Sequence, residues 1–246
     1  MIEIPNNVKI IEKEAFKDCK ELVSFRFLDD SQLQSISESM LCSTSITIIV
    51  IPKHVKVIEK RAFYMCNELK TFILFKNSEL SILKDFSIDW TSDKFYITSN
   101  LKEIDHTSFY MFYNVTEISI SPRNKNFLVV NKQIIIGKSD INKDEYDIVL
   151  FAAKNIQYAY IPSNIKKIGT KAFERCKYLN KIDFAKDSQL EIIDNDAFCY
   201  SSILEQICIP DNVKFIKKNA FRECKKLNKV VISNKIFLNV LKKSQM

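Results

Sequence analysis

The seven cysteines are the residues of this 246-residue chain whose type and spacing could most readily do chemistry. None of them forms a C-x-x-C pair, the spacing typical of zinc and redox sites. Cys19, Cys66, Cys176 and Cys224 each stand three residues after the phenylalanine of an Ala-Phe pair. If these pairs mark stacked coils, Cys19 and Cys66 lie two coils apart, roughly 9–10 Å, whereas a disulfide needs Cα atoms within about 7 Å. We therefore expect a buried ladder of thiols, with Cys208 as the exposed one.

Other catalytic arrangements are missing from the sequence. The only histidines are His54 and His106, which excludes H-E-x-x-H and Cys₂His₂ zinc motifs. The only glycines are Gly137 and Gly169, which excludes a G-x-G-x-x-G fingerprint, a P-loop and a G-x-S-x-G elbow. We expect no enzyme activity, no metal site and no cofactor.

Two further residues are candidates for binding or modification. Asn114 begins the only N-x-[ST] sequon, at a bend before a strand, and would accept a glycan if the chain enters a secretory pathway. Trp90 lies in the most degenerate repeat, where an exposed aromatic side chain would serve as a binding anchor. Local packing is the alternative role of Trp90.

The charge of the chain argues against nucleic acid as a partner. There are 37 basic and 30 acidic residues, for a formal net charge of +7. We interpret the positive surplus as spread along the chain, because it contains short pairs such as Lys225-Lys226 and no basic run interleaved with aromatic residues. No apolar stretch reaches the ~20 residues that a transmembrane helix needs. The first residues show no signal peptide, which leaves a cytosolic location, a trimmed chain or another export route open.

The strongest signal is a repeat of Ile-Pro, then Ile-x-x-x-Ala-Phe-x-x-Cys, then a leucine and a short alternating apolar stretch. The apolar anchors of the repeats, 21 to 25 residues apart except across one insertion, are Phe16, Leu41, Phe63, Ile88, Phe109, Phe173, Phe198 and Phe221. A unit this short buries its apolar face only by stacking on its neighbours. The pattern predicts a β-rich solenoid of eight coils with short helical or irregular convex segments.

The domain organisation follows from these repeats. We expect one solenoid domain over residues 1–246, with repeats at 1–120 and 159–233 and a β-hairpin insertion at 121–158. Residues 234–246 have the apolar spacing of a C-terminal capping helix. The N-terminal repeat strand has no cap in this sequence, so we expect either self-association through its open edge or a chain that is a fragment of a longer array.

The alternation within the strands predicts an outward strand face, which is where solenoids commonly bind proteins. Its mixed charge suits a protein partner. The predicted protein-binding residues are Ser24, Arg26, Thr71, Ile73, Lys94, Tyr96, Glu117, Ser119, Lys181, Asp183, Gln206 and Lys229.

The complete motif, Leu-x-x-Ile-x-Ile-Pro followed by Val-x-x-Ile-x-x-x-Ala-Phe-x-x-Cys, resembles the BspA-like class of leucine-rich repeats. The class usually has glycine after the second isoleucine, and only Ile168-Gly169 keeps it. The resemblance implies a leucine-rich-repeat fold and a surface or secreted protein that acts in adhesion and binds host proteins. An intracellular scaffold or regulatory repeat protein in the cytoplasm is the alternative.

Overall fold

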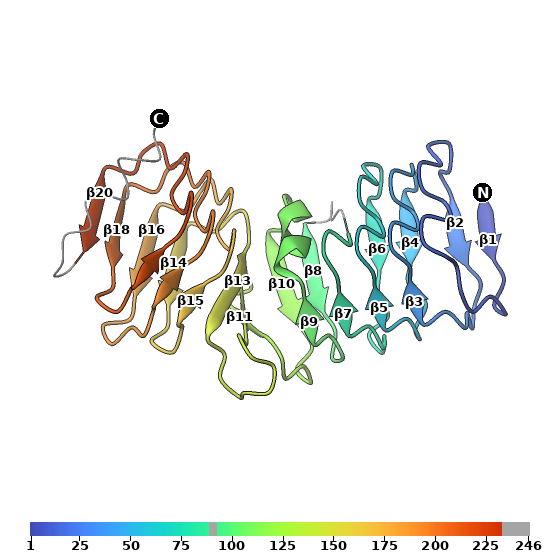
Figure 1. Cartoon of the computed structure of the whole chain (residues 1–246), viewed down its shortest axis with the longest axis horizontal. Helices are drawn as coiled ribbons and strands as arrows, with labels where there is room; N and C mark the ends of the chain where they lie inside the picture. The colour runs from blue at the N-terminus through green and yellow to red at the C-terminus, as the bar shows by residue number, and fades with distance from the viewer. Residues whose placement is uncertain (89–92, 233–246) are drawn as a thin grey trace. The chain divides into compact units, whose positions relative to one another are not determined.

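The computed structural model describes residues 1–88 and 93–232. Trp90 and the capping helix expected at 234–246 lie outside these residues. The chain forms two compact units, Met1–Asn126 and Phe127–Met246, which run from blue to green and from yellow to red in Figure 1. Each unit is a β-solenoid and is described by itself below.

After its first strand, the first unit winds through alternating longer and shorter strands (Figure 1). The longer strands, one per turn, are β1 (Ile2–Ile4), β2 (Phe25–Phe27), β4 (Ile48–Val50), β6 (Thr71–Ile73), β8 (Lys94–Ile97) and β10 (Glu117–Ile120). They pair in parallel as β1 with β2, β4 with β6 and β8 with β10. A second, four-stranded parallel sheet joins β3 (Ser35–Ile36), β5 (Val57–Ile58), β7 (Ile82–Leu83) and β9 (Glu103–Ile104).

The second unit repeats this plan after an antiparallel insertion. The strands β11 (Leu128–Val130), β12 (Ile134–Gly137) and β13 (Ile148–Ala152) pair antiparallel in that order. The predicted hairpin is thus present, and β11 adds a third strand to it. β13 then pairs in parallel with β15 (Lys167–Ile168), which continues through β17 (Ile192–Ile193) to β19 (Phe215–Ile216). The longer strands are β14 (Tyr158–Ile161), β16 (Lys181–Phe184), β18 (Gln206–Ile209) and β20 (Lys229–Ile232).

The described residues contain ten of the longer strands, so the solenoid has about ten turns rather than the predicted eight. One turn was missed because alanine replaces phenylalanine at its anchor. The Ala152 amide donates to the Ala172 carbonyl at 2.8 Å, as the anchor Leu41 does to Ala62 at 2.9 Å. The other additional turn begins at β20, beyond the last Ala-Phe pair.

The core of each unit is made by the inward side chains of the strands and by the anchors. In β4, for example, Ile49 is fully buried between the exposed Ile48 and Val50. In the second unit the anchors Phe173, Phe198 and Phe221 stack with ring centroids 5.1 and 5.2 Å apart. These three anchors of the second unit therefore pack turn upon turn.

The segment around each Ala-Phe pair forms an irregular edge rather than a helix. Left-handed residues flank the pair, for example Lys171 and Arg175, both with φ 58°. The amides of Lys171, Phe173 and Arg175 all donate to carbonyls of the next turn, at 2.7 to 3.0 Å. This turn edge therefore links neighbouring turns by backbone hydrogen bonds. The helix in the described residues is a single 3-10 helix, η1 (His106–Met111).

Candidate functional site

The outward strand face consists of those side chains of the longer strands that point away from the core. All twelve residues predicted for it are exposed or half-buried in the structure, and none is buried. Strand register brings several of them together across neighbouring turns. Lys94 lies opposite Glu117 and Tyr96 opposite Ser119 in one pair of strands, and Gln206 lies opposite Lys229 in another.

In the first unit this face carries an apolar patch. Ile48 and Val50 on β4 and Ile73 on β6 are 52%, 38% and 40% exposed, and Phe75, two residues beyond the end of β6, is 47% exposed. The strands β4 and β6 set Val50 directly opposite Ile73, and Ile48 opposite Thr71. The sequence prediction included Thr71 and Ile73 but missed Ile48 and Val50, because residues 46–51 are apolar almost without interruption and show little alternation. We call Ile48, Val50, Ile73 and Phe75 the apolar patch.

Ion pairs lie on both sides of the apolar patch along the same face. Arg26 on β2 pairs with Glu3 on β1, with an Nη2–Oε1 distance of 2.6 Å. On the other side Lys94 on β8 pairs with Glu117 on β10 at 3.6 Å. An apolar centre with a charged rim is the ordinary anatomy of a protein-binding surface.

In the second unit the same face is polar and aromatic. Tyr158 and Tyr160 alternate outward on β14 and are 46% and 47% exposed. The Tyr158 hydroxyl donates to Asp183 at 3.1 Å, and Lys181 lies 2.8 Å from the same carboxylate and 5.6 Å from the Tyr158 ring centroid. Burial and the Asp183 hydrogen bond raise the pKa of Tyr158. The sequence analysis missed both tyrosines, although their Tyr-x-Tyr spacing is the alternation that reveals outward residues.

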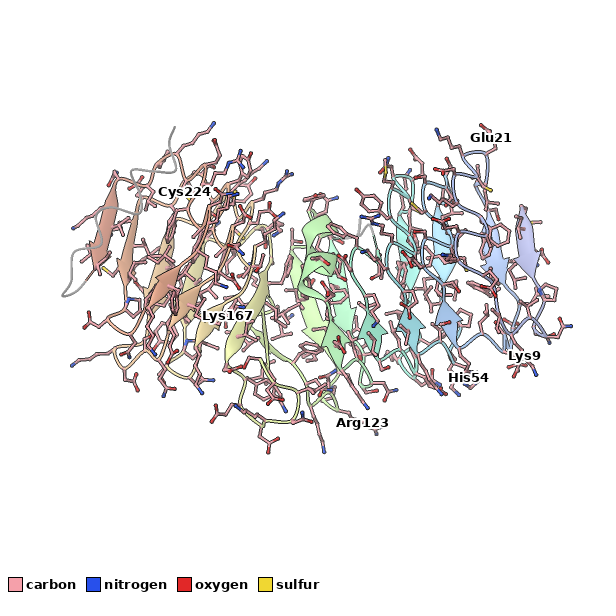
Figure 2. The ribbon with its side chains drawn as sticks, in the orientation of Figure 1. Lys9, Glu21, His54, Arg123, Lys167 and Cys224 are labelled. Carbon is pink, nitrogen blue, oxygen red and sulfur yellow. The ribbon has the colours of Figure 1, made fainter. Side chains whose placement is uncertain are left out.

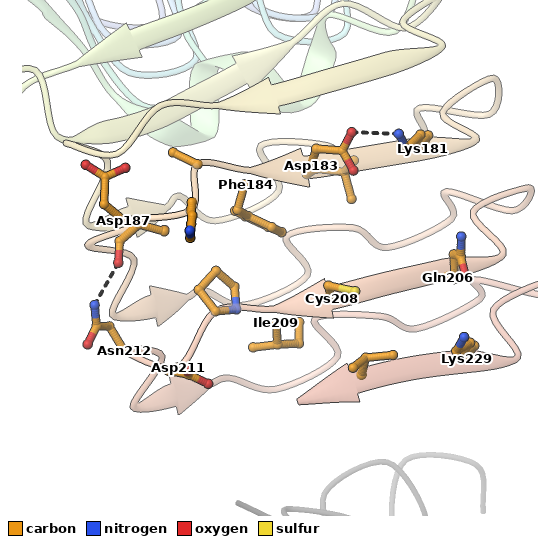
Figure 3. Close-up of a pocket in the computed structure, with 16 residues that line it drawn as sticks. Lys181, Asp183, Phe184, Asp187, Gln206, Cys208, Ile209, Asp211, Asn212 and Lys229 are labelled. Carbon is orange, nitrogen blue, oxygen red and sulfur yellow. Dashed lines mark hydrogen bonds and ion pairs between the residues drawn. The ribbon is translucent and has the colours of Figure 1, made fainter. Parts of the chain in front are cut away.

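An open groove of about 510 Å³ runs over β16, β18 and β20 (Figure 3). Four of the twelve predicted residues, Lys181, Asp183, Gln206 and Lys229, line it together with Cys208. It lies where β16 and β18 belong to separate two-stranded sheets. The lining has both charge signs and a side-chain amide, groups that can hydrogen-bond to peptide groups and charged side chains.

The cysteines do not form disulfides, and most are inert by position. Cys66, Cys176 and Cys224 are buried as expected, and Cys42 and Cys199 are buried too. Burial raises the pKa of the Cys176 thiol to about 11 and that of Cys224 to about 12. Cys208 is exposed as predicted.

The expectation that all four motif cysteines are buried is wrong for Cys19, which is exposed. Cys19 lies on the first of the described turns, and the thiol bond to the carbonyl of a preceding anchor that Cys66 makes is not formed there in this structure.

Asn114 is exposed in the turn between η1 and β10. His54 lies half-buried with its Nδ1 atom 2.8 Å from Glu79 of the next turn, as a surface link between turns.

Within residues 1–88 and 93–232, no three His, Cys, Asp or Glu side chains are grouped closely enough to hold a metal ion. No helix in the described part of the chain has the length and apolar character needed to cross a membrane.

Stacked short strands with ladders of phenylalanine and cysteine side chains define a leucine-rich-repeat solenoid. The family model for the BspA type leucine rich repeat region matches six copies, over residues 1–116 and 147–244. The chain belongs to this BspA-type leucine-rich repeat family. No curated protein sequence matches it.

Solved structures with this fold include bacterial surface proteins. A leucine-rich cell surface protein of Faecalibacterium prausnitzii aligns at 18% identity with a TM-score of 0.57, over 95% of this chain and 79% of that one. The pneumococcal vaccine antigen PcpA aligns at 20% identity with a TM-score of 0.73, over 95% of this chain and 62% of the antigen. A Bacteroides ovatus leucine-rich repeat protein aligns at 18% identity with a TM-score of 0.60, over 93% of this chain and 54% of that one. At these identities the likeness shows the fold.

Proposed function

We propose that this chain is a non-enzymatic, surface-exposed adhesion module that binds a protein partner through its outward strand face. The observation that carries the proposal is the apolar patch, where Ile48, Val50 and Ile73 stay exposed on paired strands between two ion pairs. Exposed apolar side chains grouped on one face and rimmed by charge are typical of interaction sites. The groove of the second unit would add polar contacts to the same partner or to another one.

The family supports this role and the surface location. Two of the solved structures with this fold are described as a cell surface protein and a vaccine antigen. A surface location also makes Asn114 available for glycosylation where the secretory pathway of the source organism carries out that reaction.

Binding is tested with purified chain on intact cells and on a panel of extracellular matrix proteins. The double variant Ile48→Glu/Ile73→Glu places two charges in the apolar patch, and we expect its affinity to fall at least tenfold. The matched control is Ile141→Glu, which adds a charge at an isoleucine that is 51% exposed on the insertion. The proposal fails if the control loses as much binding as the double variant, or if neither variant loses any.

The surface location is tested separately on the source cells with a membrane-impermeant biotin reagent. Labelling of the native protein on intact cells supports the adhesion role. Protection in cells that express the protein, followed by labelling after lysis, would favour an intracellular scaffold.

A further inference from the structure

The two units differ sharply in charge. Residues 1–126 contain 16 basic and 17 acidic residues, whereas residues 127–246 contain 21 basic and 13 acidic residues. The expectation that the positive surplus is spread over the chain is therefore wrong. The whole surplus belongs to the second unit.

Much of this charge gathers on the turn edge of the second unit, the edge marked by the labelled Cys224 in Figure 2. Three segments on successive turns, 170–178, 195–202 and 218–226, contain seven basic and three acidic residues. We call them the basic edge. The corresponding segments of the first unit, 13–21, 38–44 and 60–68, contain five of each sign. The basic edge is thus a property of the second unit and not of the repeat.

Backbone hydrogen bonds fix the order of the cations along the solenoid axis. The Arg175 amide donates to the Cys199 carbonyl at 2.8 Å, and the Tyr200 amide donates to the Arg222 carbonyl at 2.9 Å. Successive turns in such a ladder are about 4.8 Å apart. The Arg175 guanidinium carbon lies 5.7 Å from the centroid of the Tyr200 ring, which orients that cation. Arg175, Tyr200 and Arg222 therefore follow one another on three turns.

Most of these cations are available to a ligand. Lys177, Lys218, Arg222 and Lys226 are exposed and make no ion pair within the described residues. The acidic residues of the edge offset them little. Glu174 pairs with Lys171 at 3.6 Å and Glu223 with Lys225 at 3.8 Å, while Asp196 is half-buried. Four unpaired cations on a strip three turns wide produce a strong local positive potential.

We propose that the basic edge binds a linear sulfated polysaccharide. Sulfate groups accept hydrogen bonds from arginine and lysine in the same way as phosphate, with bidentate geometry at arginine. An extended anionic chain lying along the solenoid axis would meet Arg175 and Lys177 on the first turn and Lys218, Arg222 and Lys226 on the third, two steps of about 4.8 Å away, because the middle turn carries no cation. The exposed rings of Tyr178 and Tyr200, 60% and 39% accessible, offer flat apolar surfaces to sugar rings. Duplex nucleic acid fits less well, because this edge has no helix or projecting strand to enter a groove.

The proposal is tested with the full chain and immobilised heparin as the sulfated polysaccharide. The variant Lys218→Gln/Arg222→Gln/Lys226→Gln removes three unpaired cations. The control Lys13→Gln/Lys20→Gln/Lys70→Gln removes three exposed lysines of the first unit and changes the net charge equally. Far-UV circular dichroism and a melting curve establish that both variants are folded. A duplex DNA serves as a second polyanion.

We expect the basic-edge variant to bind heparin at least tenfold more weakly at 0.15 M salt, while the control stays within twofold of the parent chain. The slope of log Kobs against log salt should become shallower by about 2 for the basic-edge variant. Equal losses in the two variants would mean a response to net charge alone and would overturn the proposal. Binding of duplex DNA as tight as that of heparin would overturn the assignment to a sulfated polysaccharide.

Discussion

The Cys224 thiol donates a hydrogen bond to the backbone carbonyl of Phe198, 3.1 Å away in the preceding turn. Cys66 does the same to Leu41 at 3.1 Å, and Ser201 takes this role toward Phe173 at 2.8 Å. Each donor stands three residues after an anchor and reaches the anchor of the turn before. The motif cysteine is therefore a small buried donor that joins two turns, and serine can replace it.

The first prediction follows from this donor role. Cys224→Ser should keep the bond to Phe198, whereas Cys224→Ala loses it and leaves a small cavity, at a cost of about 1–2 kcal/mol. Urea denaturation followed by circular dichroism measures the difference. An alanine variant as stable as the serine variant would show that the cysteine acts only by filling space.

The second prediction concerns thiol reactivity. Only Cys19 and Cys208 are exposed among the seven cysteines. Burial raises the pKa of Cys176, Cys199 and Cys224 to about 11 or 12, so these thiols carry almost no thiolate near neutral pH. Mass spectrometry after iodoacetamide treatment at pH 8 should find two labels on the native chain and seven after denaturation. Rapid labelling of Cys176 in the native chain would contradict the packing described here.

The third prediction is a pH dependence at Asp194. Burial alone would raise the pKa of this carboxyl, but Lys167 at 2.6 Å, the Asn195 amide at 2.8 Å and Lys217 at 3.1 Å hydrogen-bond it and hold the pKa at about 2. A pKa lowered in the folded state stabilises the chain above the unfolded value of 3.8, and this contribution is lost as the pH falls toward about 2. Asp194→Asn should therefore cost about 2 kcal/mol at pH 7.

Denaturant midpoints between pH 7 and pH 2.5 test this prediction. The gap between the parent chain and Asp194→Asn should narrow steadily below pH 4. The exposed Asp187 supplies the matched control, since Asp187→Asn should have little effect at any pH. A gap that stays constant over the whole range would show that charge on Asp194 is not the cause.

The fourth prediction concerns Gly169, the one residue that keeps the glycine usual in this family. A Cβ atom there would lie 2.7 Å from the Val149 carbonyl oxygen, to which the Gly169 amide donates at 2.8 Å. Gly169→Ala should destabilise the second unit by about 1–3 kcal/mol. Gly137→Ala should cost less, because its Cβ would meet the movable end of the Leu150 side chain. Thermal melts compare the stabilities of the two alanine variants. An equal loss of stability would contradict the close approach of the Val149 carbonyl to Gly169 as the cause.

Much of the fold could be predicted from the sequence because each repeat has two recognisable sets of core residues. One is the alternating apolar strand and the other is the Ala-Phe pair. The alternation of Phe25 and Phe27, for example, was enough to place Ser24 and Arg26 on the outward strand face. The turn anchored at Ala152 escaped because its buried anchor has no aromatic side chain. The outward positions of Ile48 and Val50 were not predicted, because the inward and the outward residues of that strand are all apolar and no alternation shows.

Other features depend on three-dimensional packing that no local pattern carries. Lys171 and Arg175 have left-handed backbone conformations although they are not glycines. Hydrogen bonds from their backbone amides to carbonyls of the next turn hold this conformation. Cys19 is exposed and Cys66 is buried, although the two cysteines belong to the same motif. The concentration of positive charge in the second unit depends on the boundary between Asn126 and Phe127, which no local motif marks.

The central claim, protein binding through the outward strand face, is tested most directly by photo-crosslinking. A benzophenone side chain is placed singly at Ile73 on the apolar patch, at Gln206 in the groove, or at Ile141 on the insertion as control, and each chain is bound to intact cells before irradiation. Crosslinks to one partner protein from Ile73, from Gln206 or from both, with none from Ile141, are the result that this account predicts. Crosslinking from Ile141 alone, or with equal yield from all three positions, would contradict it.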